Sequence, residues 1–77
     1  MKTSLDLYKT FYYVARSGSI TQAANELVIS QPAVSKAIKV LESDLDTILF
    51  NRNKDGVTLT NAGELLFNKI KQSIELI

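Results

Sequence analysis

The sequence contains neither cysteine nor histidine. Without cysteine, no disulfide and no thiolate metal site can hold the fold together. Without histidine, the chain lacks the most common general base, the most common metal ligand and any imidazole-dependent nucleophile pair. Asp44 and Asp46 flank the expected end of a helix, and Glu42 lies two residues before Asp44; residues two apart do not face one another on a helix. We therefore expect no catalytic residue, no metal and no cofactor in this segment, and predict that it is not an enzyme.

Long apolar runs are also missing. No stretch approaches the roughly 20 apolar residues that span a bilayer, and the N-terminus lacks the basic segment and apolar stretch of a signal peptide. The 77 residues allow one domain, and 45% apolar with 22% charged residues is ordinary for a globular protein. These features predict a small cytoplasmic binding module with no membrane partner. Because the net charge is only +1, any nucleic acid must be recognised by where the charges lie.

Apolar residues at helical spacing predict a first helix over about residues 5–16. They are Leu5, Tyr8, Phe11, Tyr12 and Ala15. Gly18 follows them as a helix stop. Ser19 and Gln22 form an S-x-x-Q capping box, which predicts that a second, short helix begins at Ile20.

A third helix is predicted from Gln31 to about Leu45, after residues 28–30 break the second one. Ser30 is its N-cap, and Pro32 lies in its first turn, where proline costs little. Its apolar face consists of Val34, Ile38, Leu41 and Leu45. We expect the second and third helices to share a core of small and apolar side chains, namely Ala23, Ala24, Leu27, Ile29, Val34 and Ile38.

Two short β-prone runs, residues 48–52 and 57–60, flank an Asp-Gly turn at 55–56 and predict a hairpin. Arg52 and Lys54 lie around its tip. A basic hairpin of this kind suits contact with phosphates or insertion into a minor groove.

A last helix follows the hairpin and is capped by Thr60 or Asn61; Glu64 favours Asn61, but the pattern does not decide between them. The order of elements predicts a mainly α fold, a winged helix-turn-helix with three helices, a short β-hairpin wing and a C-terminal linker helix. The expected boundaries are residues 1–60 for the domain, about 19–38 for the helix-turn-helix, about 48–60 for the wing and 61–77 for the start of the linker helix.

The outward face of the third helix carries Gln31, Pro32, Ser35, Lys36 and Lys39 in its N-terminal half. Glutamine can read an adenine edge, serine permits a close approach, and lysine can pair with phosphate or guanine. The helix N-terminus adds partial positive charge and free N–H groups. The C-terminal half is acidic, with Glu42 on the outward face and Asp44 and Asp46 after it. We therefore predict that this helix enters a major groove of double-stranded DNA with its N-terminus leading.

Other interpretations stay open on these residues alone. A short helix–helix corner or a solvated polar face shows part of the same pattern, and a winged helix can also be a protein-interaction module that never touches DNA. Tyr8, Tyr12 and Tyr13 suggest stacking on unpaired bases, but their spacing on one helix favours core packing. Duplex binding that weakens steeply with salt would separate DNA binding from protein interaction.

Five short motif blocks follow one another in register along nearly the whole chain. They are GSITQAA at 18–24, SQPAVSK at 30–36, LE at 41–42 with Leu45, LFNR at 49–52 and LTNAG at 59–63. This combination resembles the LysR-type transcriptional regulators. The resemblance implies an N-terminal winged helix-turn-helix, a linker helix that forms homodimers, and an effector-binding domain. That last domain is absent from this segment and would bind a small-molecule inducer.

The resemblance also assigns DNA contacts to the second helix, the third helix and the wing. With the residues chosen above, the predicted DNA-binding set is Thr21, Gln22, Ser30, Gln31, Pro32, Ser35, Lys36, Lys39, Arg52 and Lys54. Two positions depart from the family pattern. Lys36 stands where arginine is frequent, which favours phosphate over bidentate guanine contact. Asp46 stands where glycine is usual, and aspartate tolerates the left-handed conformation expected there.

An apolar stripe runs along the last helix. It consists of Leu66, Ile70, Ile74 and Ile77, with Phe67 and Leu65 beside it, and the residues predicted to form the dimer are Leu66, Phe67, Ile70, Ile74 and Ile77. This is more apolar surface than one small core requires, so we expect the last helices of two chains to pack antiparallel in a homodimer. The alternative is that Leu65 and Leu66 alone dock on the first helix.

Overall fold

Four helices and one two-stranded hairpin make up the computed structural model, which describes the backbone of residues 4–75 and the side chains of residues 6–73. In chain order the elements are α1 (Ser4–Ser17), α2 (Ile20–Leu27), α3 (Gln31–Leu45), β1 (Phe50–Asn53), β2 (Gly56–Leu59) and α4 (Asn61–Glu75). The predicted mainly α winged helix-turn-helix is confirmed. No helix in the described range is long and apolar enough to cross a membrane.

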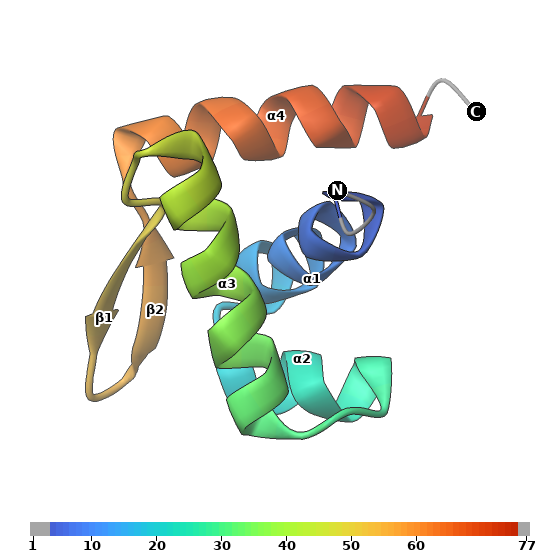
Figure 1. The fold of residues 1–77 in the computed structure, drawn as a ribbon, viewed down its shortest axis with the longest axis vertical. Coiled ribbons are helices and arrows are strands. Elements are labelled where there is room, and N and C mark those ends of the chain that lie inside the picture. The colour runs from blue at the N-terminus through green and yellow to red at the C-terminus, as the bar shows by residue number, and fades with distance from the viewer. Residues whose placement is uncertain (1–3, 76–77) are drawn as a thin grey trace.

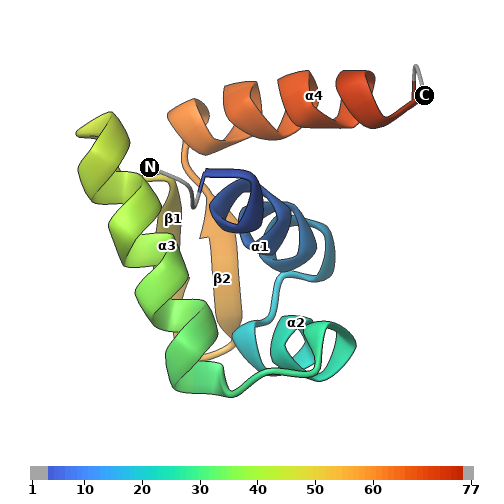
Figure 2. The ribbon, with the colours of Figure 1, turned by 45° about the vertical axis from the view of Figure 1, so that its right-hand side comes forward.

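α1 lies at the centre of the domain and packs against α2, α3 and α4. Phe11 and Val14 of α1 are fully buried, and the Phe11 ring lies 5.2 Å from that of Phe50 at the start of β1. The rest of the buried apolar core is Leu7, Ala23, Ala24, Val34, Ile38, Leu41 and Leu49. α4 runs across one end of the domain, and α2 and the first turns of α3 lie at the opposite end (Figure 1, Figure 2).

Side-chain caps fix where α2 and α3 begin. The Ser19 hydroxyl accepts a hydrogen bond from the Gln22 backbone N–H at 3.1 Å, and the Ser30 hydroxyl accepts one from the Ala33 N–H at 3.2 Å. The expected capping box is only half formed, because the Ser19 N–H donates to the Ser17 hydroxyl at 3.2 Å and not to Gln22. Both helix starts therefore lie where the sequence predicts them.

The N-cap of α4 is Thr60, so the preference for Asn61 was wrong. The Thr60 hydroxyl accepts from the Gly63 N–H at 3.0 Å and donates to the Ile48 carbonyl at 2.8 Å. Gly63 permits this close packing, because a Cβ atom there would collide with the Leu49 carbonyl oxygen. Thr60 is selected by a contact with a distant segment, which a local helix-start pattern does not contain.

Two helices end on residues in the left-handed conformation. Asp46 has φ 54° at the end of α3, as expected, but Val28 has φ 59° at the end of α2, an unusual conformation for a β-branched residue. Two residues assigned to the core are exposed instead. Ile29 follows the left-handed turn and is 44% exposed, and Leu45 lies beyond Leu41, the last buried residue of α3, and is 40% exposed.

The hairpin is antiparallel and pairs Phe50 with Leu59 and Asn53 with Gly56. Its two-residue turn is therefore Lys54-Asp55, one position earlier than the expected Asp-Gly turn. The Val57 N–H donates to the Gly18 carbonyl at 3.2 Å. This bond fixes the hairpin beside the turn between α1 and α2.

Candidate nucleic-acid interface

The N-terminal half of α3 presents the predicted reading face to solvent. Gln31, Pro32, Lys36 and Lys39 are exposed, and Ser35 is half-buried. A shallow groove follows this face of α3; it is lined by Pro32, Ser35, Lys36, Lys39, Val40, Ser43 and Asp44. The structure thus brings four predicted residues into one groove, with Gln31 exposed at the start of the same helix.

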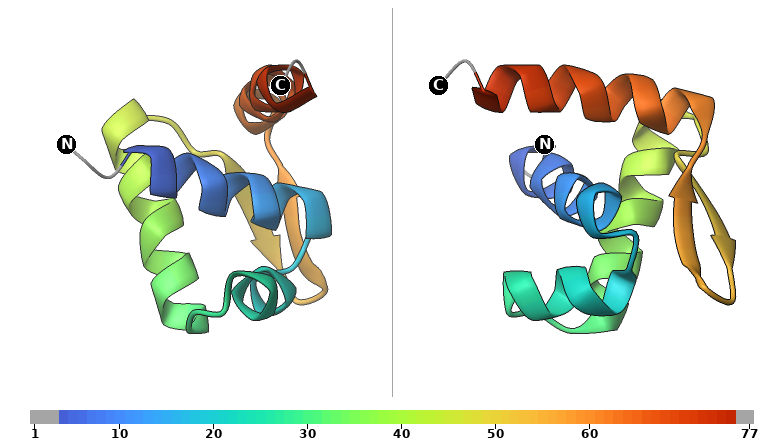
Figure 3. Two further views of the ribbon diagram at one scale, coloured as in Figure 1. Left: turned by 90° about the vertical axis from the view of Figure 1, so that its right-hand side faces the viewer. Right: turned by 180° about the vertical axis from the view of Figure 1, so that it is seen from behind.

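A second groove lies between the start of α2 and the hairpin. It is lined by Ser19, Ile20, Thr21 and residues 52–57. Thr21 is therefore a neighbour of Arg52 and Lys54, although it lies about 30 positions before them in the sequence. The hairpin turn, α2 and the first turn of α3 all lie at the end of the domain opposite α4 (Figure 3).

Ser30 and Gln22 complete the predicted set but line neither groove. The Ser30 hydroxyl is used as the N-cap of α3. Gln22 is exposed on α2, and its amide nitrogen donates to Glu26 at 3.5 Å. Both residues lie in the helix-turn-helix beside the two grooves.

Glu42 has a role that the sequence did not reveal. It was expected on the outward acidic face of α3, but it is half-buried, and one carboxylate oxygen accepts from the backbone N–H groups of Leu49 at 2.8 Å and Phe50 at 3.2 Å. The carboxylate thereby joins α3 to the start of the hairpin. No short motif signals this contact, because the partners lie seven and eight positions along the chain.

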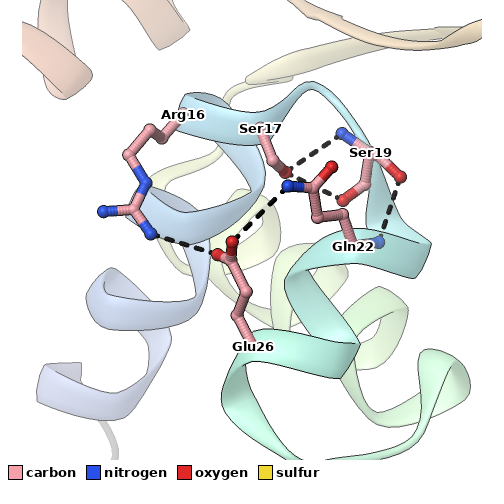
Figure 4. A network of polar contacts seen from close by, with 5 residues as sticks. All are labelled: Arg16, Ser17, Ser19, Gln22 and Glu26. Carbon is pink, nitrogen blue, oxygen red and sulfur yellow. Dashed lines mark hydrogen bonds and ion pairs between the residues drawn. The ribbon is translucent and has the colours of Figure 1, made fainter.

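An ion pair between α1 and α2 was also missed. Arg16 Nη2 lies 3.0 Å from Glu26 Oε1, and the same carboxylate receives the Gln22 amide (Figure 4). The hydrogen bond to Glu26 raises the pKa of the Arg16 guanidinium above its ordinary value. The guanidinium carbon lies 4.7 Å from the centre of the Tyr13 ring and 5.4 Å from that of Tyr12.

The tyrosines of α1 serve packing. Tyr8 and Tyr13 pack against the core, and the Tyr12 ring stacks on Phe67 of α4 at 5.5 Å. These contacts agree with the prediction that the three tyrosines pack against the core, so all three rings already have partners within the domain.

The apolar stripe of α4 is partly covered by the domain itself. Leu66, Phe67 and Ile70 are half-buried and pack against the core, whereas Leu65 is 67% exposed. The alternative in which Leu65 and Leu66 alone dock on α1 is therefore wrong. The side chains of Ile74 and Ile77 lie outside the described residues.

A helix pair joined by a tight turn, with a hairpin beside its second helix, defines the winged helix-turn-helix class. Within it, the chain belongs to the lysR family of bacterial regulatory helix-turn-helix proteins, whose family model matches residues 5–64. It is a LysR-type helix-turn-helix DNA-binding domain.

Relatives of known sequence are transcriptional regulators. The chain is 42% identical over 71 residues to the HTH-type transcriptional regulator CysL of Bacillus subtilis (strain 168). The aligned region covers 92% of this chain and 24% of that protein. It is 51% identical over 59 residues to the HTH-type transcriptional regulator TdcA of Escherichia coli (strain K12), covering 77% of this chain and 19% of that protein. The chain thus spans about a quarter of the length of the curated relatives it matches.

Solved structures of the same fold include complexes with DNA. The CbnR DNA-binding domain bound to DNA superposes with a TM-score of 0.85 at 34% identity, covering 92% of this chain and 82% of that one. The BenM DNA-binding domain bound to the catB site 1 DNA gives a TM-score of 0.83 at 29% identity, covering 94% and 83%.

We predict that Glu42→Ala lowers the free energy of unfolding by about 1–3 kcal/mol, because two backbone N–H groups at the base of the hairpin lose their acceptor. Glu42→Gln keeps an oxygen that accepts hydrogen bonds and should lose clearly less. Urea denaturation of both variants and the wild type measures the difference. Equal losses for alanine and glutamine would show that these two hydrogen bonds do not stabilise the hairpin.

Proposed function

We propose that this domain binds double-stranded DNA sequence-specifically, as the non-catalytic DNA-reading part of a transcriptional regulator. The observation that carries the proposal is the placement of the N-terminal half of α3 at the same end of the domain as the basic hairpin. The DNA complexes formed by the CbnR and BenM domains support it. The proposed contact set is Thr21, Gln22, Ser30, Gln31, Pro32, Ser35, Lys36, Lys39, Arg52 and Lys54.

In this proposal α3 enters the major groove with its N-terminus leading. The carboxamide of Gln31 both donates and accepts, as the major-groove edge of adenine requires. Ser35, one turn further, is small enough for the helix to lie close to the bases. Lys36 supplies a point charge that suits phosphate better than bidentate guanine recognition.

The hairpin is proposed to contact the backbone or the minor groove. Arg52 and Lys54 are exposed and line a groove with Thr21, so a phosphate between the hairpin and α2 would be approached from both sides. Phosphate contacts fix the position of the domain on the duplex without reading the sequence.

We further propose that residues 1–60 form the DNA-binding domain and that residues 61–77 begin a linker helix. In the full-length regulator this helix leads to an effector-binding domain that takes a small-molecule inducer. A regulator that binds chromosomal DNA in bacteria works in the cytoplasm, which is the proposed location.

A homodimer through α4 is the proposed assembly, with Leu66, Phe67, Ile70, Ile74 and Ile77 at its interface. Leu66, Phe67 and Ile70 remain half-buried after packing on the core, so apolar surface is left for the antiparallel α4 of a second chain. Sedimentation equilibrium should show a dimer at high protein concentration or on DNA. A monomer under both conditions would overturn this assembly.

The proposed phosphate contacts of the hairpin make binding dependent on salt. Arg52→Ala and Lys54→Ala should weaken binding to all duplexes about equally, and each lost phosphate contact should reduce the log–log salt slope by roughly 0.9. Fluorescence anisotropy at several salt concentrations measures both quantities. A loss confined to the preferred sequence, with an unchanged slope, would mean that the wing reads bases.

Gln31 is the residue of α3 that we propose reads a base. Gln31→Ala should cost about 1–3 kcal/mol on the preferred duplex and relax the preference at one base pair per half-site. Affinity for unrelated duplexes should hardly change, because no charge is lost, and folding should be kept, because Ser30 is the cap.

Lys36→Ala is the contrasting variant, since removing its charge should weaken every duplex. Competition binding with preferred and scrambled duplexes compares the two. If Gln31→Ala lowers both affinities by the same factor, Gln31 positions the helix and does not read a base.

A further inference from the structure

The carboxylate of Glu26 gathers two side chains from different helices. Arg16 reaches it from the last turn of α1 at 3.0 Å, and Gln22 reaches it from one turn earlier on α2 at 3.5 Å (Figure 4). Gln22 belongs to the proposed DNA contact set. The contact between α1 and α2 therefore extends to a side chain that is expected to face phosphate.

Glu26 is unfavourable at this position unless its charge is balanced. It is the only charged residue of α2, and it shares a helix face with Gln22 because the two are four positions apart. Charges separated by less than the Debye length, about 8 Å at physiological salt, interact appreciably. An unpaired carboxylate one turn from a phosphate contact would oppose DNA binding.

Arg16 is held beside Glu26 by more than the ion pair. Its guanidinium lies over the rings of Tyr13 and Tyr12, at 4.7 Å and 5.4 Å from their centres. Tyr12 is in turn stacked on Phe67 of α4. An exposed ion pair usually exchanges freely with solvent, whereas these ring contacts keep the positive charge close to the carboxylate.

We propose that Arg16 is a positioning residue for DNA binding: it cancels the charge of Glu26 and so lets Gln22 lie against a phosphate, without touching the DNA itself. The inference rests on the proposed function. A carboxamide has two N–H donors, so Gln22 can bond Glu26 with one and a phosphate oxygen with the other. Arg16 and Glu26 then influence the affinity for a duplex through Gln22, without contacting the DNA themselves.

The test is a double-mutant cycle on duplex affinity, using Arg16→Met, Glu26→Gln and the double variant at several salt concentrations. Arg16→Met should weaken binding to every duplex by about two- to fivefold at low salt, and the effect should fade as salt screens the carboxylate. Glu26→Gln should bind at least as tightly as the wild type. The double variant should bind within about twofold of Glu26→Gln, because no charge remains to be cancelled.

A double variant as weak as Arg16→Met would overturn the inference, since Arg16 would then act on the DNA or on the fold directly. Weaker binding by Glu26→Gln alone would also overturn it. Thermal unfolding of each variant separates loss of folded protein from loss of affinity. Arg16→Lys, which keeps the charge, should retain most of the wild-type affinity.

Lys9→Met is the matched control for net charge, because Lys9 is exposed on α1 two turns before Arg16. It should weaken binding less than Arg16→Met does, and equal weakening would mean that net charge alone explains the effect. If the wild type binds no duplex, the proposed function itself fails. If the wild type binds and Arg16→Met binds equally well, only the role of Arg16 fails.

Discussion

The carboxylate of Glu42 fixes the position of the hairpin relative to α3, the two elements that we propose to contact DNA most extensively. It accepts hydrogen bonds from the backbone N–H groups of Leu49 and Phe50 at the base of the hairpin, while its own helix, α3, carries the proposed reading face. Near the hairpin turn, the bond from the Val57 N–H to the Gly18 carbonyl provides a second anchor. With both ends attached, the hairpin holds Arg52 and Lys54 beside Thr21. The geometry of the proposed contact surface therefore depends on the Glu42 carboxylate at the base of the hairpin and on the Val57–Gly18 backbone hydrogen bond near its turn.

The sequence predicted the helices well because their starts are local. The hydroxyls of Ser19 and Ser30 cap their helices by accepting a hydrogen bond from the backbone N–H three residues later. This spacing is visible in the sequence. The exposure of Gln31, Pro32, Lys36 and Lys39 on α3 also followed from helical periodicity. Glu42, the Arg16–Glu26 pair and the choice of Thr60 over Asn61 were missed because each depends on a contact between segments seven or more positions apart.

Charge placement matters more in this domain than total charge. The net charge of +1 gives little general attraction for DNA. Four cations are nevertheless exposed on the proposed contact surface. Lys36 and Lys39 line the groove along α3, and Arg52 and Lys54 line the groove between α2 and the hairpin. Glu42 accepts hydrogen bonds from the hairpin backbone and Glu26 pairs with Arg16, so one carboxylate of α3 and one of α2 already have partners within the protein.

The central claim is that the N-terminal half of α3 reads base sequence, and selection from a random duplex pool tests it most directly. Repeated rounds of binding should enrich one half-site motif, and pairs of half-sites at a fixed spacing should appear if the domain binds as a symmetric dimer. The Gln31→Ala variant should enrich the same motif but lose the preference at one of its base pairs. If the wild-type domain binds the pool in a salt-dependent manner but enriches no sequence, α3 does not read bases and the account is contradicted.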